Sequence, residues 1–139
     1  MSLHIVKDYF YENNLSCVIA QNQKIVFTSK ESGVKPLLTY IQTHGTSIHS
    51  LIVADRIIGK AAALLASYLH VQQIYTPILS VSGKEILDRY GIQVEYETLV
   101  PYIQNRAKTG PCPMEILVSS IATSQEAYEK IAHVVKESF

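Results

Sequence analysis

The feature that most constrains this chain is an apolar run that changes to a short polar turn and then to an alanine-rich helix. Leu51-Ile52-Val53-Ala54 is a short, uninterrupted apolar segment, which is typical of a strand buried on both faces of a sheet. A polar turn follows, and then a helix is predicted over residues 59–70 that is apolar on nearly every side. A buried strand that leads into a buried helix predicts an α/β fold, with helices on both faces of a sheet.

Composition and charge narrow the class of protein further. The chain has 139 residues, of which 47% are hydrophobic and 17% charged, so we expect one folded domain over residues 1–139. Twelve basic and twelve acidic residues leave no basic excess, which argues against a protein that binds duplex nucleic acid. We see no signal peptide, no apolar run as long as the roughly 18–20 residues of a membrane span, and no cysteine framework. These observations together predict a cytoplasmic protein that is not bound to membranes.

The rest of the chain alternates between strand and helix patterns. A hairpin is predicted from strands over residues 16–20 and 24–28, and the complete order is α-β-β-α-β-α-β-α-β-α-α. This order predicts a mixed five-stranded sheet in a three-layer α-β-α sandwich. The last helix carries apolar residues at helical spacing, and we expect it to cap the sheet, with a homodimer surface as the alternative. The other predicted helices span residues 2–13, 34–44, 83–90, 114–121 and 125–137, and the other predicted strands span residues 51–54, 73–76 and 93–96.

Three turns are expected to meet where strands end and helices begin, which is where α/β folds bind ligands. They span residues 29–36, 55–60 and 105–115. The first backbone N–H groups of a helix are unpaired and favour anions. We therefore predict that Lys60, Arg106 and backbone N–H groups hold an anionic group, while Asp55 and Glu115 orient the rest of the ligand. The complete set of candidate binding residues is Gly33, Lys35, Asp55, Gly59, Lys60, Asn105, Arg106, Cys112 and Glu115.

Each candidate also has a purely structural interpretation. Asp55 is equally well placed to cap the following helix, and the two lysines to be solvated surface charges. The glycines suit turns that need a positive φ. Cys112, flanked by prolines at a predicted helix start, is either a thiol of lowered pKa or a small residue packed in a tight turn.

Four motifs in one order extend over nearly the whole chain. They are Ser32-Gly33-Val34-Lys35-Pro36-Leu37-Leu38, the run over residues 54–63, the run over residues 99–106, and Gly110-Pro111-Cys112-Pro113-Met114-Glu115. In these motifs the sequence resembles the bacterial and archaeal family known as domain of unknown function 1893. The resemblance implies a cytidine-deaminase-like fold with an α-β-β-α-β-α-β core. It implies no activity, because the family has none established.

The chemistry of zinc deaminases does not follow from this resemblance. Those enzymes need a His or Cys ligand with a nearby Glu at one helix start and Pro-Cys-x-x-Cys at the next. The corresponding turns at residues 32–36 and 55–60 contain neither Cys nor His. The motif at residues 111–115 has Glu115 where the second Cys would stand, and it comes too late in the chain. We therefore predict no metal and no cofactor.

The leading hypothesis is a deaminase-like domain that binds a small anionic metabolite or nucleotide without catalytic zinc. A second hypothesis is a metal-independent enzyme in which Cys112 or Lys60 reacts covalently. A third is an interaction module without a small-molecule site, for which the three turns would not meet or side chains would fill the pocket.

Overall fold

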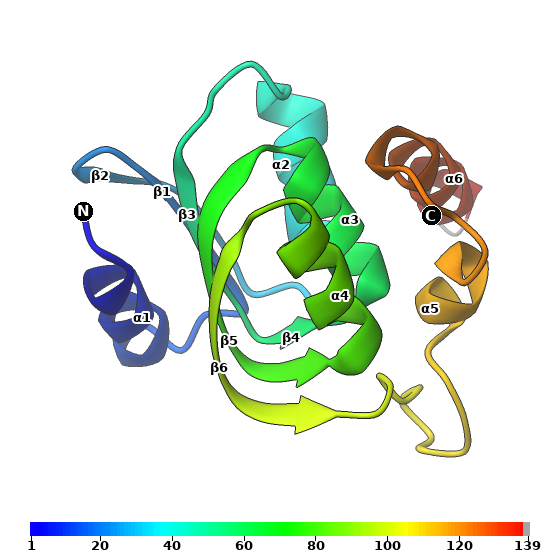
Figure 1. Ribbon diagram of the computed structural model, residues 1–139. Helices are drawn as coiled ribbons and strands as arrows, with labels where there is room; N and C mark the ends of the chain where they lie inside the picture. Colours follow the sequence, from blue (N-terminus) through cyan, green and yellow to red (C-terminus); the bar gives the residue numbers. More distant parts are fainter. Residues whose placement is uncertain (138–139) are drawn as a thin grey trace.

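The computed structural model describes residues 1–137 and shows helices on both faces of a twisted sheet (Figure 1). The strands are β1 (Cys17–Gln21), β2 (Lys24–Ser29), β3 (Leu51–Asp55), β4 (Ile57–Ile58), β5 (Val71–Ser80) and β6 (Gln93–Val100). The helices are α1 (Leu3–Glu12), α2 (Lys35–His44), α3 (Lys60–Tyr68), α4 (Val81–Arg89), α5 (Pro113–Val118) and α6 (Ser124–Glu137). Within residues 1–137, no helix is both long and apolar enough to cross a membrane.

In the part of the chain that the structure describes, the sheet is mixed and has six strands. The predicted hairpin is confirmed: β1 and β2 are antiparallel, and Gln21 pairs with Lys24 across a two-residue turn. β1 is also antiparallel to β3, whereas β3, β5 and β6 run parallel to one another. The sequence predicted five strands because β4, only two residues long, was assigned to the turn. β4 resumes the pairing with β5 after Arg56 interrupts it.

β5 spans Val71–Ser80 and is much longer than the strand predicted over residues 73–76, and it continues through Pro77. Pro77 lies opposite the break between β3 and β4: Ala54 pairs with Tyr75, and Ile57 with Ile78. A proline has no N–H to donate to a sheet, so the strand tolerates it where the neighbouring strand is interrupted.

The two faces of the sheet are covered by different numbers of helices. Among residues 1–137, α1 is the one helix on its face of the sheet, and it buries Val6 and Phe10 there together with Tyr75 of β5. α2, α3 and α4 lie on the other face, and every residue of α3 from Ala61 to Ser67 is buried. Its alanines allow close approach to the sheet, and its burial agrees with the prediction of a helix that is apolar on nearly every side.

The last two helices correct the three-layer prediction. α5 and α6 lie outside α3, on the side away from the sheet (Figure 1). The apolar stripe of α6 packs on α3: Ile131 is fully buried and Tyr128 stacks on Tyr68 with 4.9 Å between ring centroids. The expectation that α6 caps the sheet is therefore wrong. α3 already covers the sheet there, and it presents a second apolar side that α6 buries.

Candidate functional site

The three predicted turns line one cavity of about 730 Å³. One turn precedes α2, one joins β3 to α3 through β4, and one follows β6 and leads into α5. The lining is largely apolar, with a few polar and charged groups from each turn, as is common in small-molecule sites. Its apolar residues include Val34, Ile57, Ala62, Ile103, Met114 and Val135.

All of the predicted site residues except Lys60 line this cavity. The Lys60 ammonium group donates to the backbone carbonyl of Ser119, at 3.1 Å from Nζ to O. That carbonyl lies at the C-terminal end of α5, where carbonyls lack helical partners and attract cations. The side chain that we expected to hold an anion thus holds a helix end instead, and Lys60 is not placed as a nucleophile in the cavity.

Glu115 caps α3 from a distance. Its Oε1 accepts from the backbone N–H of Lys60 at 2.7 Å, and its Oε2 from that of Ala61 at 3.0 Å. The N-cap residue of α3 is Gly59, which has no side chain to do this. A Cβ at Gly59 would lie 2.3 Å from Oε1 of Glu115. The glycine is therefore required by the close approach of a carboxylate and not by its own backbone angles.

Asp55 ends β3 as a buried acid. Its side chain is 3% exposed, and its Oδ2 has no hydrogen-bond partner among the described residues. Burial raises the pKa of Asp55 to about 8, and the backbone N–H groups of Arg56 and Ile57 and the Arg56 charge offset only part of this effect. Arg56 also lines the cavity, and its guanidinium donates to the carbonyl of Leu15 and lies 4.7 Å from the Phe10 ring centre.

The third turn is shaped by Asn105 and joined to the first by Arg106. Asn105 accepts from the backbone N–H of Thr109 at 3.0 Å and donates to the Thr109 hydroxyl at 3.2 Å. These bonds hold the loop in shape and use the amide group that we expected to meet a ligand. Arg106 donates to the hydroxyl of Ser32 at 3.0 Å, and both residues line the cavity. Sequence reasoning missed Ser32, although it opens the first motif beside Gly33.

The remaining candidates are Gly33, Lys35 and Cys112. Gly33 has a φ of +68°, so the first turn requires a glycine there. Cys112 is half-buried and is the N-cap residue of α5. Its backbone N–H donates to the carbonyl of Ile103 at 2.9 Å. Lys35 begins α2 and also lines a neighbouring groove.

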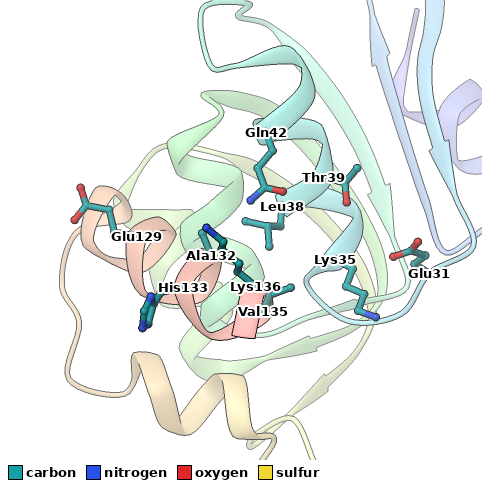
Figure 2. Close-up of a pocket in the computed structure, with 10 residues that line it drawn as sticks. All are labelled: Glu31, Lys35, Leu38, Thr39, Gln42, Glu129, Ala132, His133, Val135 and Lys136. Atoms are coloured by element: carbon teal, nitrogen blue, oxygen red, sulfur yellow. The ribbon is translucent and has the colours of Figure 1, made fainter. Parts of the chain in front are cut away.

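The groove lies between α2 and α6 and has a volume of about 790 Å³ (Figure 2). Leu38, Ala132 and Val135 provide its apolar surface, and polar side chains stand around them. The groove and the cavity share Glu31, Lys35 and Val135, so they adjoin at the start of α2. The helical spacing of apolar residues marks Val135 as part of the apolar stripe of the last helix, but no local pattern reveals that this residue lines the cavity.

Comparison with known proteins gives the family. The sequence profile of the family described as Domain of unknown function (DUF1893) matches residues 5–135. The chain belongs to the DUF1893 family. The crystal structure of a DUF1893 family protein (TM1506) from Thermotoga maritima matches with a TM-score of 0.86 at 23% identity, over 99% of this chain and 89% of that chain. That likeness shows a shared fold. The comparison with curated proteins gives no match.

The donor set of this DUF1893 protein does not resemble a zinc centre. Within residues 1–137, no three or more His, Cys, Asp or Glu side chains are grouped so that they could hold a metal ion. Cys112 and Glu115 both line the cavity, but the Glu115 carboxylate is already bound to α3. A catalytic zinc site takes three protein ligands and an open position.

Proposed function

We propose that this DUF1893 protein binds a small anionic metabolite, of nucleotide type, in the cavity where the three turns meet, without catalytic zinc. The observation that carries the proposal is Asp55: an acid that is 3% exposed, lacks a partner for Oδ2 among the described residues, and lines a cavity of about 730 Å³. A buried polar group without a partner costs stability, so its retention in a cavity wall favours a binding role.

The cavity also offers the two kinds of contact that such a ligand needs. Its apolar residues suit an uncharged, planar part of the ligand, which burial removes from water. Lys35, Arg56 and Arg106 line the cavity and supply positive charge that attracts an acid group, against the two carboxylates of Glu31 and Glu115 in the same lining. Asp55 does not oppose this attraction near neutral pH, because a carboxyl group with a pKa of about 8 is then mostly uncharged.

The element order supports the relation to deaminases that we propose as part of this function. From α1 to β5 the chain runs α-β-β-α-β-α-β when β3 and β4 are taken as one interrupted strand. This is the core order that the sequence resemblance implies. In such open sheets, ligands bind beyond the carboxyl ends of the parallel strands, and the cavity includes Asp55, the last residue of β3.

A thermal-shift panel of nucleoside mono-, di- and triphosphates tests the proposal. We expect at least one of them to raise the melting temperature of the wild type, and Arg106→Gln to reduce that shift. Lys108→Gln is the matched control, because it removes one positive charge from an exposed position on the same loop that does not line the cavity. The absence of a shift for every phosphorylated ligand, or an equal loss in both variants, would refute the proposal.

A second candidate function is a metal-independent enzyme with Cys112 as its nucleophile. The observation in its favour is that this half-buried, free thiol lines the same cavity as the Asp55 carboxyl group. Labelling of Cys112 with a thiol reagent across pH values separates the two functions, with Cys17→Ser as the background because Cys17 is fully buried. A Cys112 that reacts no faster than a model thiol removes this candidate.

A further inference from the structure

The N-terminus of α3 is an anion site that the chain itself occupies. The backbone N–H groups of Lys60 and Ala61 point at one carboxylate, and both oxygens of that carboxylate accept from them. The same bonds would suit two oxygens of a phosphate or of another carboxylate. Gly59 leaves the space that this approach needs, since a Cβ there would lie 2.3 Å from the bound oxygen.

We propose that the N-terminus of α3 is the acid-group subsite of the cavity, and that Glu115 occupies it until the phosphate or carboxylate of a ligand displaces it. The inference rests on the proposed function, because the ligand is the anionic one proposed above. It adds where the acid group binds and which side chain must leave.

The groups around the subsite are consistent with an exchangeable occupant. Asp55 lines the same cavity with Oδ2 unpartnered among the described residues, so the cavity that contains the subsite has a buried polar group without a bond. Burial raises the pKa of Asp55 to about 8, so this acid adds little negative charge against an incoming anion near neutral pH. Gly59 and Glu115 both line the cavity, so a ligand there reaches the subsite without crossing the core.

The exchange conserves hydrogen bonds. The two N–H groups that release Glu115 take up two ligand oxygens, and the half-buried Glu115 side chain turns toward water. Tethering favours Glu115, because its carboxylate is present at a high effective concentration. The ligand's other contacts in the cavity must supply the difference. A lone anion is therefore expected to compete poorly in the wild type and well once the Glu115 carboxylate is removed.

Inorganic phosphate tests this expectation without a known ligand. We would titrate phosphate into the wild type and into Glu115→Ala, and follow the backbone amide NMR signals of Lys60 and Ala61 together with the melting temperature. The variant is expected to bind phosphate at least about tenfold more tightly, with its largest shifts at these two amides. Glu126→Ala is the control, because it removes one carboxylate from the exposed first turn of α6 and should behave as the wild type.

Two results would overturn the inference: a folded Glu115→Ala that binds phosphate no better than the wild type, or phosphate shifts that avoid Lys60 and Ala61. If Glu115→Ala does not fold, Glu115→Gln replaces it; this variant keeps an oxygen acceptor, loses the charge, and must still show tighter phosphate binding than the wild type. The outcome is independent of the nucleotide panel. A failed panel with phosphate bound at α3 refutes only the proposed function, and the reverse result refutes only the subsite.

Discussion

The cavity wall contains two acidic side chains, of which Glu115 has a hydrogen-bond partner for each oxygen and Asp55 has none for Oδ2 among the described residues. Glu115, in the first turn of α5, accepts two backbone hydrogen bonds from the start of α3 and lies where the helix dipole favours an anion. Asp55, at the end of β3, is buried, and its Oδ2 has no partner among the described residues. Burial raises the pKa of Asp55 to about 8, so this group keeps its proton near neutral pH. A site in which one acid accepts hydrogen bonds and the other keeps its proton can accept and donate hydrogen bonds at once.

The comparison also shows where the stability of the site comes from. Glu115 stabilises the fold, because it satisfies N–H groups that Gly59 cannot cap and holds α5 against α3. Asp55 destabilises it, because a carboxyl group is removed from water without full compensation. Natural proteins retain such a cost mainly at functional sites.

The largest effect is expected from Asp55→Asn. The folded chain holds the Asp55 proton up to about pH 8, whereas the unfolded chain releases it near 3.8. Between these values the folded state binds more protons, so the wild type loses stability as pH rises. The asparagine variant has no such titration and should be more stable than the wild type by up to about 4 kcal/mol near pH 7. The gain should vanish below about pH 4 and level off above about pH 8.

Urea melts of both proteins at several pH values provide the measurement. The groups that act on Asp55 are the Cys17 thiol across the β1–β3 ladder, the Arg56 charge, and the backbone N–H groups of Arg56 and Ile57. All are present in both proteins, so the difference between the two curves isolates Asp55. Asp88→Asn is the control, because Asp88 is exposed and pairs with Lys84 on the surface of α4. A difference that does not change with pH would mean that Asp55 is ionised.

The next largest effect is a loss of stability, expected from Gly59→Ala, which disturbs the capping of α3 by Glu115. Gly59→Ala places a Cβ against the Glu115 carboxylate, although a φ of −105° allows alanine there. The carboxylate must leave, so the cost should equal that of Glu115→Ala, about 2 kcal/mol for the lost bonds to a charged group. Because both changes break the same contact, the double variant should cost about 2 kcal/mol and not twice that. Additive costs in denaturant melts would show that Gly59 acts independently of Glu115.

Much of the fold follows from local patterns. The hairpin, the buried strand β3 and the enclosed helix α3 each have a periodicity or an apolar run that marks them. Local patterns fail to predict a feature when it depends on a segment elsewhere in the chain. Pro77 ends a strand when it is considered alone, but β5 continues because its neighbour is broken opposite that residue. α6 packs outside α3 because α3 has a second apolar side. The sequence shows that α3 is apolar all round, but not that one of its sides faces a helix instead of the sheet.

In the site too, local features were predicted from the sequence and long-range contacts were not. The three turns were predicted because each follows a strand or precedes a helix, and they do line one cavity. The pairing of Glu115 with the start of α3 was not predicted, since 55 residues separate it from Lys60. The direction of the Lys60 side chain was missed for the same reason: its partner, Ser119, becomes a neighbour only when α5 packs on α3. Chemistry at a turn can be predicted from the sequence, whereas the group that satisfies it can lie anywhere in the chain.

The smallest effect is expected from Ser80→Ala, which removes a helix cap supplied from within the same segment. It serves as a comparison for Glu115, which caps α3 from another helix. α4 is capped locally: the Ser80 hydroxyl accepts from the backbone N–H of Gly83 at 3.0 Å. Ser80→Ala should cost about 1 kcal/mol, the usual value for an N-cap. Hydrogen exchange should then increase only in the first turn of α4. Glu115→Ala should instead increase exchange at the start of α3 and throughout α5, because its bonds join two helices. If both variants loosen only the helix that loses its cap, Glu115 does not couple α5 to the cavity, and a ligand that displaced it would leave α5 in place.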